Sequence, residues 1–391
     1  MIYKKNFSFV KKLKIFLKKK NKQLHEPTFD SADVKSLNKC IKSTYVSTIG
    51  NEINKFENLL KKKTKSKYVI TTVNGTSAIQ LALKYYGINE NDEVLLPSLN
   101  FISSANAILS CNASLNFVEI DKESMCVCPN KLKVYLDKIL VKKKSVYYNK
   151  FTNKRVRSLI LLHIFGHAAK MTELRKICKD FKINIIEDAA ECLGSYYINN
   201  KNKKNHLGTI SDLGILSFNG NKIITTGGGG AILTNKKKIY QYLLSISNHG
   251  KIKKSKTSFE YKYPGLNLLM PNLNASLGCS QFKKLDKFIK KKRLIYIKYS
   301  NLLKNEKDIE IFKEQKHCYS NYWLQVMILS KKLKKYRNNI IREFHSSGIQ
   351  VRPAWKLLHK IKFLKNSQSS NLSISEDLWS RIITLPSTPG I

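Results

Sequence analysis

The 391-residue sequence predicts an α/β protein with a mostly parallel central sheet and a smaller α+β domain after it. From about residue 68, short apolar segments alternate with amphipathic helical segments, as in a sheet covered by helices. Segment 158–163 is almost entirely apolar, which is typical of a strand in the middle of a parallel sheet. After about residue 271 this alternation gives way to longer helical segments, so we expect a second domain there.

The elements follow from apolar spacing and from the residues that interrupt it. Predicted strands are 68–72, 93–96, 115–120, 158–163, 183–187, 215–218, 231–234 and 322–329. Predicted helices are 75–86, 103–111, 171–181, 274–303 (one long or broken helix) and 335–347, with a helix and an exposed lysine-rich insertion over 131–157. Asn74 opens the first helix, and Pro97 ends the second strand. We divide the chain into a basic arm and helix (1–50), a large domain (51–270) and a small domain (271–391).

The composition is strongly basic, with 71 Lys and Arg against 27 Asp and Glu and a net charge of +44. Most of these residues are lysines scattered along the chain, without the clustered arginines and aromatics that read bases. We therefore expect no specific nucleic-acid binding, only weak attraction to polyanions. The eight cysteines form no CxxC pair, which favours a reducing cytoplasm and no structural metal.

The N-terminal arm has apolar residues at helical spacing among lysines. They are Phe9, Val10, Leu13, Phe16 and Leu17. A basic amphipathic helix of this kind can lie on an anionic membrane surface. The alternative, which we favour, is an arm that packs on a partner subunit or stays mobile. The segment lacks the continuous apolar run of a signal peptide or membrane span.

One lysine stands out from the many in the chain. Lys222 lies between a predicted strand and the glycines 227–230. Glycine allows a ligand to approach the backbone closely, and a partly desolvated lysine can form a Schiff base with an aldehyde cofactor. The alternative is an ordinary solvated lysine before a tight turn.

A pair of acidic residues follows the predicted strand 183–187. Asp188 lies at the carboxyl end of that strand, where α/β sheets place ligand-binding groups, and Glu191 is close enough to face the same pocket. A carboxylate there can pair with a protonated pyridine nitrogen. The alternative is that Asp188 caps a helix.

Two turns complete the pattern. Gly75 and Thr76 open a helix whose free N–H groups form a natural phosphate site, although such caps are common. Phe101, just past a strand end, can stack on a planar ring or belong to the core. His163 and His167 have no acidic third ligand at a usual spacing, so we expect no metal site.

Together and in this order, these segments resemble the DegT/DnrJ/EryC1/StrS sugar-nucleotide aminotransferases, a fold-type I pyridoxal-phosphate group. The resemblance runs from about residue 25 to 386, through segments 56–57, 75–78, 97–101, 163–166, 187–194, 217–230, 249–250, 265–278 and 385–387. It implies a homodimer with Lys222 linked covalently to pyridoxal phosphate. It implies these further cofactor contacts: Asp188 at the pyridine nitrogen, Glu191 near the phenolic oxygen, Gly75, Thr76 and Ser217 at the phosphate, Phe101 on the ring, and Asn267 at the phosphate of the neighbouring subunit.

Four further segments resemble one subgroup of this family and indicate the substrate. Segments 25–27, 46–47, 95–98 and 348–355 look like a subgroup linked to bacillosamine and legionaminic acid pathways. This implies amination of UDP-4-keto-6-deoxy-GlcNAc by glutamate, with Ser47, His249 and Trp355 at the substrate. Leu269 stands where the family commonly has Arg, which puts anion binding in doubt. The alternatives are a noncatalytic scaffold and a related sugar dehydratase; dehydratases of the family have His in place of Lys222.

Overall fold

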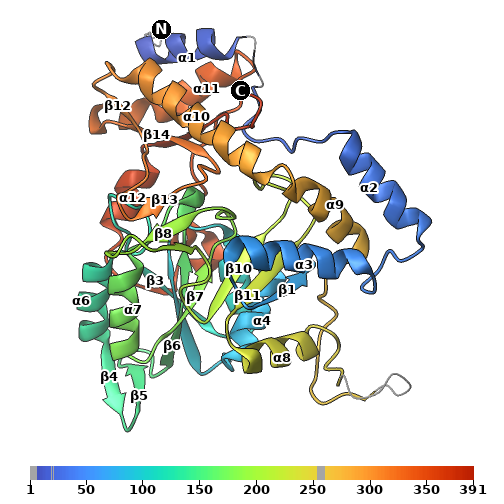
Figure 1. Cartoon of the computed structure of the whole chain (residues 1–391). Coiled ribbons are helices and arrows are strands. Elements are labelled where there is room, and N and C mark those ends of the chain that lie inside the picture. The colour runs from blue at the N-terminus through green and yellow to red at the C-terminus, as the bar shows by residue number, and fades with distance from the viewer. Residues whose placement is uncertain (1–6, 19, 21, 253–259) are drawn as a thin grey trace.

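A mixed sheet of ten strands forms the centre of the computed structural model, which describes residues 7–18, 20, 22–252 and 260–391 (Figure 1). Eight strands lie edge to edge in the order β1-β11-β10-β7-β6-β2-β3-β15. They span Tyr68–Thr72 (β1), Asp92–Pro97 (β2), Ser114–Val118 (β3), Arg155–Leu162 (β6), Asn184–Asp188 (β7), Leu213–Ser217 (β10), Gly230–Thr234 (β11) and Gln368–Ser369 (β15). The other two, Leu140–Lys143 (β4) and Val146–Asn149 (β5), form a hairpin that pairs with β6.

The strand directions decide where functional groups can gather. Strands β10, β7, β6, β2, β3 and β15 pair in parallel along the sheet. Strand β11 is antiparallel to both β10 and β1, so β1 points the same way as the parallel strands. The carboxyl ends of β1, β10, β7, β6 and β2 therefore share one edge of the sheet.

Helices cover both faces of this sheet, as a parallel sheet requires. Leu159 and Leu161 of β6 pack in the apolar layer beneath α3, α6 and α7, whereas Ile160 packs beneath α4, α5 and α8. This alternation follows because successive side chains of a strand point to opposite faces. The six helices are Asn51–Thr64 (α3), Gly75–Tyr85 (α4), Ile102–Leu109 (α5), Pro129–Ile139 (α6), Met171–Asp180 (α7) and Lys237–Ile246 (α8).

A smaller antiparallel sheet of order β12-β14-β16 lies toward the C-terminal end of the chain (Figure 1). Its own apolar layer contains Tyr299, Met327 and Phe344 among its most buried members. The elements of this part are Leu285–Leu303 (α10), Ile309–Ile311 (β12), Gln325–Leu329 (β14), Arg337–His345 (α11), Ser373–Trp379 (α12) and Ile382–Leu385 (β16). Strand β15, from the same part of the sequence, instead joins the main sheet beside β3.

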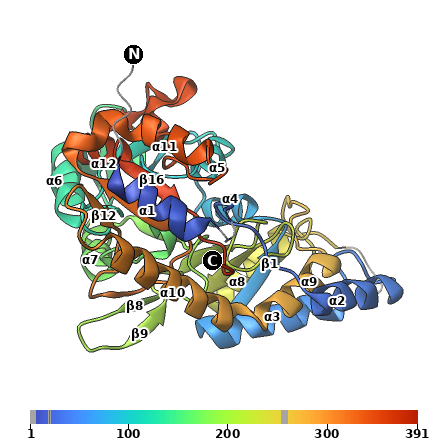
Figure 2. The same cartoon turned by 90° about the horizontal axis from the view of Figure 1, so that it is seen from above.

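The N-terminal helix α1 (Ser8–Leu17) packs on the small sheet's layer, beside α10 and α11 (Figure 2). Val10 and Leu13 are completely buried there, and Ile15 on the opposite face is 66% exposed. The expectation of an arm on a partner subunit or a mobile arm is therefore wrong for these residues. The apolar face that a membrane surface would require is covered by the chain itself. Within the described residues, no helix has the length and apolar composition of a membrane span.

The long helix predicted over 274–303 is broken into α9 (Asn272–Phe282) and α10. Helix α9 packs against α3 so closely that a Cβ added at Gly278 would lie 2.9 Å from the Phe56 ring. Helix α2 (Ser31–Lys42) lies along the other side of α9 (Figure 2). Helix α10 continues beyond the break to the small sheet, where it packs beside β12 (Figure 1).

The remaining elements are short. A third sheet has the order β13-β8-β9, with strands Tyr196–Ile198 (β8), Lys204–His206 (β9) and Cys318–Tyr319 (β13). Four 3₁₀ turns cover Ile164–Gly166 (η1), Lys331–Tyr336 (η2), Leu358–Lys360 (η3) and Lys362–Leu364 (η4). These elements, together with α3, α8, α12, β4, β5, β12, β15 and β16, are missing from the sequence prediction.

Candidate active site

The predicted residues meet at the sheet edge where β1, β10, β7 and β2 end. Asp188 is the last residue of β7, Ser217 is the last residue of β10, and Lys222 lies in the loop that follows β10. Gly75 begins α4 soon after β1, and Phe101 is the N-cap of α5 after β2. Because these strands point the same way, residues far apart in sequence are brought to one side of the sheet.

The amine of Lys222 is held between a carboxylate and an aromatic ring. Its Nζ lies 3.6 Å from Glu191 Oε1 and 4.1 Å from the centre of the Trp323 ring. The Lys222 side chain is only 13% exposed. The Trp323 ring is held in place because its Nε1 donates a hydrogen bond to the backbone oxygen of Asn221, at 2.7 Å. Both neighbours offset the loss of hydration of the cation.

Asp188 is buried at the base of this site. Its Oδ2 accepts a hydrogen bond from Ser104 Oγ at 2.9 Å, and its Oδ1 accepts one from the amide of Ala190 at 3.2 Å. Burial raises the pKa of Asp188, against the opposing effects of these hydrogen bonds and of Lys222. A buried carboxylate gains most from a cationic partner. A protonated pyridine nitrogen would be such a partner, so Asp188 fits the expected cofactor.

Glu191 is a second buried acid, and it links Lys222 to a sharp turn. Its Oε2 accepts a hydrogen bond from the Phe165 amide at 2.6 Å. Burial raises the pKa of Glu191 to about 7, although Lys222 acts to lower it. Phe165 itself has a left-handed backbone, with φ of 55°. At neutral pH this side chain is therefore poised to gain or lose a proton beside Lys222.

The start of α4 has the geometry of an anion site. Asn74 caps this helix: its side chain accepts a hydrogen bond from the Ser77 amide at 2.8 Å. The amides of Gly75 and Thr76 precede the first intrahelical hydrogen bond, and they lie at the positive end of the helix dipole. These two N–H groups can bind a phosphate.

Two glycines allow the start of α4 to lie close to the end of β10 and the start of β11. A Cβ added at Gly75 would lie 3.2 Å from Ser217 Cβ and 3.4 Å from its Oγ, so the serine hydroxyl borders the helix start. A Cβ added at Gly230 would lie 2.5 Å from the Asn74 carbonyl and 2.7 Å from Gly75 N. The close approach therefore depends on glycine at position 230, and the hydroxyl of Ser217 and the helix amides can contact the same anion.

Four aromatic rings border the site. Phe101 is 50% exposed and meets Trp355 edge-on, with ring centres 6.0 Å apart. Trp355 stacks on Phe165 at 5.4 Å and lies nearly parallel to Trp323 at 6.3 Å. Phe101 is thus not a core residue, and the predicted Trp355 reaches this edge from the C-terminal part of the chain.

The two histidines considered as metal ligands have other surroundings. His163 Nε2 lies 3.1 Å from Glu187 Oε2, and Glu187 also accepts backbone hydrogen bonds. His167 is buried against the rings of Phe312 and Tyr322. In the part of the chain that the structure describes, no group of three or more His, Cys, Asp or Glu side chains is arranged to hold a metal ion.

Three predicted residues lie on exposed loops instead. Ser47, His249 and Asn267 are exposed, and no hydrogen bond or ion pair among the described residues joins them to Lys222, Asp188 or Glu191. Asn267 pairs with Asn248 through an isolated bridge. Leu269, in the position of the family arginine, is half-buried and pairs with Thr72 at the end of β1.

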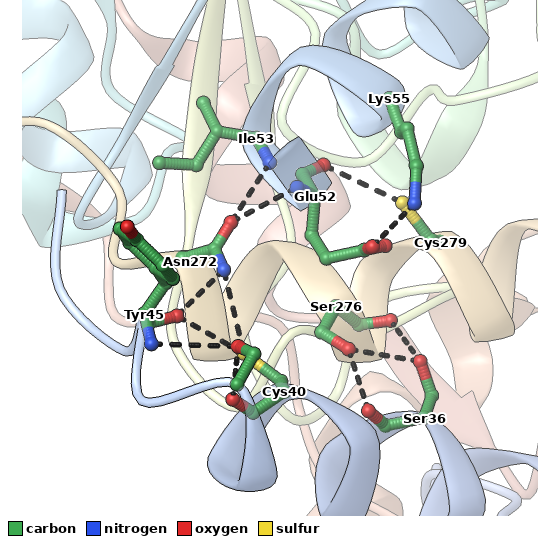
Figure 3. Close-up of polar contacts among 10 residues, drawn as sticks. Ser36, Cys40, Tyr45, Glu52, Ile53, Lys55, Asn272, Ser276 and Cys279 are labelled. Carbon is green, nitrogen blue, oxygen red and sulfur yellow. Dashed lines mark hydrogen bonds and ion pairs between the residues drawn. The ribbon is translucent and has the colours of Figure 1, made fainter. Parts of the chain in front are cut away.

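The loop that carries Ser47 is fixed by Asn272 at the start of α9 (Figure 3). Asn272 Oδ1 accepts hydrogen bonds from the amides of Glu52 and Ile53 at 3.0 and 3.2 Å, and its Nδ2 donates one to Tyr45 O at 2.7 Å. The Asn272 amide also donates to Ser47 O at 2.6 Å. One side chain therefore holds the loop after α2 against the first turn of α3.

Sequence reasoning missed Ser104, Phe165 and Trp323. Ser104 lies one helical turn after Phe101, a spacing that places it near the same edge. Trp323 comes from beyond residue 300, and no local pattern connects it to Lys222. These residues become visible only once the chain is folded.

Comparison with known proteins identifies the family. The model of the DegT/DnrJ/EryC1/StrS aminotransferase family matches residues 27–391. A GDP-perosamine synthase of Vibrio cholerae is 31% identical over 369 residues, which cover 94% of each chain. A UDP-4-amino-4,6-dideoxy-N-acetyl-beta-L-altrosamine transaminase of Campylobacter jejuni is 27% identical over 336 residues, covering 86% of this chain and 84% of the relative.

Among solved structures, the Helicobacter pylori aminotransferase PseC, described as involved in pseudoaminic acid biosynthesis, has a TM-score of 0.82 with 22% identity. The match covers 94% of both chains and concerns the fold, which confirms the predicted fold class. Lys222, Asp188 and Glu191 lie close enough for their charges to influence one another, and α4 begins at the same edge of the sheet. The chain therefore belongs to the DegT/DnrJ/EryC1/StrS aminotransferase family and is a pyridoxal-phosphate-dependent sugar aminotransferase.

Proposed function

We propose that this enzyme transfers an amino group from glutamate to a nucleotide-linked 4-keto-6-deoxy sugar, for the synthesis of a surface polysaccharide or glycan. The substrate that we favour is UDP-4-keto-6-deoxy-GlcNAc. The observation that carries the proposal is the sheltered amine of Lys222. It lies beside Glu191, and the buried Asp188 lies at the same edge of the sheet.

Each residue of the site has a proposed task. Pyridoxal phosphate, when bound, withdraws electrons from the carbon that loses its proton. Lys222 would hold it covalently and, once released, would carry that proton on Nζ. Asp188 would keep the ring nitrogen protonated, and Glu191 would contact the phenolic oxygen. Phe101 would stack on the ring.

The start of α4 would bind the cofactor phosphate. Gly75 and Thr76 supply amides and Ser217 supplies a hydroxyl, so the phosphate would sit at the positive end of a helix. Asn267 would reach the phosphate of the neighbouring subunit from its exposed loop. Trp323 would hold the amine of Lys222 close by after its release, because the ring already lies over Nζ.

The nucleotide of the substrate is the part on which the relatives differ. The two relatives compared above carry GDP and UDP in their names, at 31% and 27% identity. We favour UDP because segments 25–27 and 348–355 resemble the bacillosamine and legionaminic acid subgroup. Ser47, His249 and Trp355 would contact this substrate, and nearby lysines would replace the arginine that is lost at Leu269.

The surface around α2 supports a homodimer. Val34, Ile41, Tyr45 and Ile49 are 56–74% exposed. Tyr45 and Ile49 border a groove of about 1270 Å³ between α2, α3 and α9, and this groove is not lined by Lys222, Asp188 or Glu191. An apolar rim of this kind marks a protein interface. A second copy of the chain would cover it and bring its own Asn267 loop to the cofactor.

The cellular setting follows from the cysteines. All eight are free thiols, and five of them are buried. Free thiols persist in a reducing compartment, so we propose the cytoplasm.

The first test is an amination screen. Purified enzyme, glutamate and 4-keto sugars linked to UDP, GDP or dTDP are incubated, and the amino sugar is detected by mass spectrometry. We expect amination of the UDP-linked sugar. Product from a GDP-linked sugar alone would correct the nucleotide, and no product from any keto sugar would refute the proposed reaction.

The second test concerns Lys222. The purified enzyme should absorb near the boundary of visible and ultraviolet light, and Lys222→Ala should abolish this band and all activity. Borohydride reduction followed by peptide mapping locates the modified lysine. A reduced adduct at another lysine would show that the assignment of Lys222 is wrong.

A further inference from the structure

The imidazole of His25 is an unexplained polar group close to Lys222. Both of its ring nitrogens are buried, and neither has a hydrogen-bond partner among the described residues. Leaving a buried donor or acceptor without a hydrogen bond is unfavourable, so such atoms usually have a partner. His25 therefore differs from His163, whose Nε2 lies against Glu187.

The backbone on both sides of His25 is fixed. Leu24 O accepts a hydrogen bond from the Ser387 amide at 2.7 Å, and the Glu26 amide donates one to Thr388 Oγ1 at 3.0 Å. His25 thus lies on a segment that is tied at two points to the residues after β16. The backbone that carries the ring is therefore held in place and is not part of a loose arm.

A short series of contacts leads from this segment to the active-site amine. The buried Lys292 Nζ donates hydrogen bonds to Ser387 O at 2.7 Å and to Trp323 O at 2.9 Å. The Trp323 ring in turn lies over Lys222. The segment that carries His25 is therefore linked to the active site through Ser387, Lys292 and Trp323.

The charge state of the ring defines what it can bind. Burial, with the charges of Lys292 and Lys222, lowers the pKa of His25 well below its usual value. The ring is therefore neutral at neutral pH, with one nitrogen as a donor and the other as an acceptor. A carboxylate such as that of glutamate would satisfy only the donor. A hydroxyl or acetamido group of a sugar both donates and accepts, so it can satisfy the ring more completely.

We propose that His25 binds the sugar ring of the nucleotide-linked substrate through its two unpaired nitrogens. The inference rests on the proposed function and deepens it, because it assigns a specificity-determining residue to the sugar half of the reaction. His25 would orient the sugar toward Lys222 and would take no part in the glutamate half.

Equilibrium binding separates the sugar from the nucleotide. Isothermal titration of cofactor-loaded enzyme uses UDP-N-acetylglucosamine and GDP-mannose, which lack the keto group and do not react, with UDP and GDP as sugar-free controls. His25→Phe should weaken binding of the preferred nucleotide sugar about tenfold, as expected for two lost hydrogen bonds. Binding of the matching diphosphate should change less than twofold. Equal losses for both ligands, or no loss for either, would overturn the inference.

The two half-reactions give an independent readout. Absorbance follows the cofactor from its aldehyde to its amine form with glutamate, and back again with the keto sugar. In His25→Phe the glutamate step should stay within about twofold of wild type, while the keto-sugar step should slow about tenfold. His25→Gln, which keeps a donor and an acceptor, should recover part of the loss. A slower glutamate step with an unchanged sugar step would contradict the assignment.

Controls keep the inference distinct from the proposed function. Retention of the Lys222 absorbance band shows that a variant is folded, and His25→Ala replaces His25→Phe if the larger ring is not accommodated. If wild-type enzyme aminates no keto sugar, the proposed function has failed. If wild type is active and His25→Ala binds nucleotide sugars as wild type does, only the role of His25 has failed.

Discussion

The close approach of β11 to the start of α4 gives the sharpest test of the phosphate site. Gly230→Ala adds a Cβ 2.5 Å from the Asn74 carbonyl and 2.7 Å from Gly75 N. Ordinary contact begins at 3.4 Å, so the backbone must separate by 3.4 − 2.5 = 0.9 Å. Overpacking of this kind typically costs about 1–3 kcal/mol. Part of that strain falls on the amides that we assign to the phosphate.

The assay is a titration of cofactor-free enzyme with pyridoxal phosphate, followed by the absorbance of the Lys222 link. A cost of this size corresponds to roughly a fivefold to hundredfold weaker affinity if the helix start moves away from Ser217. The matched control is Gly228→Ala, two residues earlier, where the added Cβ would lie 3.7 Å from Val73 O, an ordinary contact. Gly228→Ala should bind cofactor as wild type does.

Thermal unfolding of the cofactor-free variants completes the experiment. Gly230→Ala should lower the melting temperature, and Gly228→Ala should not. The decisive result is the cofactor affinity. If Gly230→Ala takes up pyridoxal phosphate with wild-type affinity, then the helix start and Ser217 do not form the phosphate site, and our reasoning from this glycine is refuted.

Two further predictions concern Glu191 and α1. Burial raises the pKa of Glu191 from 4.5 to about 7. Between pH 4.5 and about 7, Glu191 is therefore still protonated in the folded protein but has lost its proton in the unfolded chain. This protonation adds about 3 kcal/mol to the free energy of unfolding. The contribution is fully present below about pH 4.5 and is lost as the pH rises through 7. The melting temperature of cofactor-free wild type should thus fall more steeply between pH 5 and 8 than that of Glu191→Gln; parallel curves would contradict the pKa. In α1, Leu13 is completely buried and Ile15 is 66% exposed. Leu13→Ala should destabilise the protein by about 2–5 kcal/mol in urea unfolding, and Ile15→Ala by less than about 0.5 kcal/mol. Similar small effects of both would show that α1 does not pack as described.

The main sheet was predictable because its strands carry their signal locally. The predicted strand 158–163 overlaps β6 at all but its last residue, and Tyr68–Thr72 matches β1. Asp188 and Lys222 could be placed near one edge because each follows such a strand. Short elements such as β8 and β9 were missed because three residues carry no usable periodicity.

The parts of the site that were missed depend on contacts between distant segments. Nothing near Trp323 in the sequence indicates that its ring covers Lys222, and the backbone on both sides of His25 is fixed by the distant residues Ser387 and Thr388. The position of the break between α9 and α10 also escaped prediction, because the helical spacing continues through 274–303. Local patterns therefore predict which residues lie at the carboxyl ends of the strands. They do not predict which side chains of the C-terminal part, such as Trp323, contact those residues.

The packing of α1 has a consequence for biosynthesis. Residues 8–17 are synthesised long before the helices that cover them, α10 and α11, which span Leu285–Leu303 and Arg337–His345. Until those helices have been made, the nascent chain presents an uncovered apolar helix flanked by lysines. Such exposed surface invites aggregation and chaperone binding. We expect α1 to become resistant to proteases only after α10 and α11 have been synthesised.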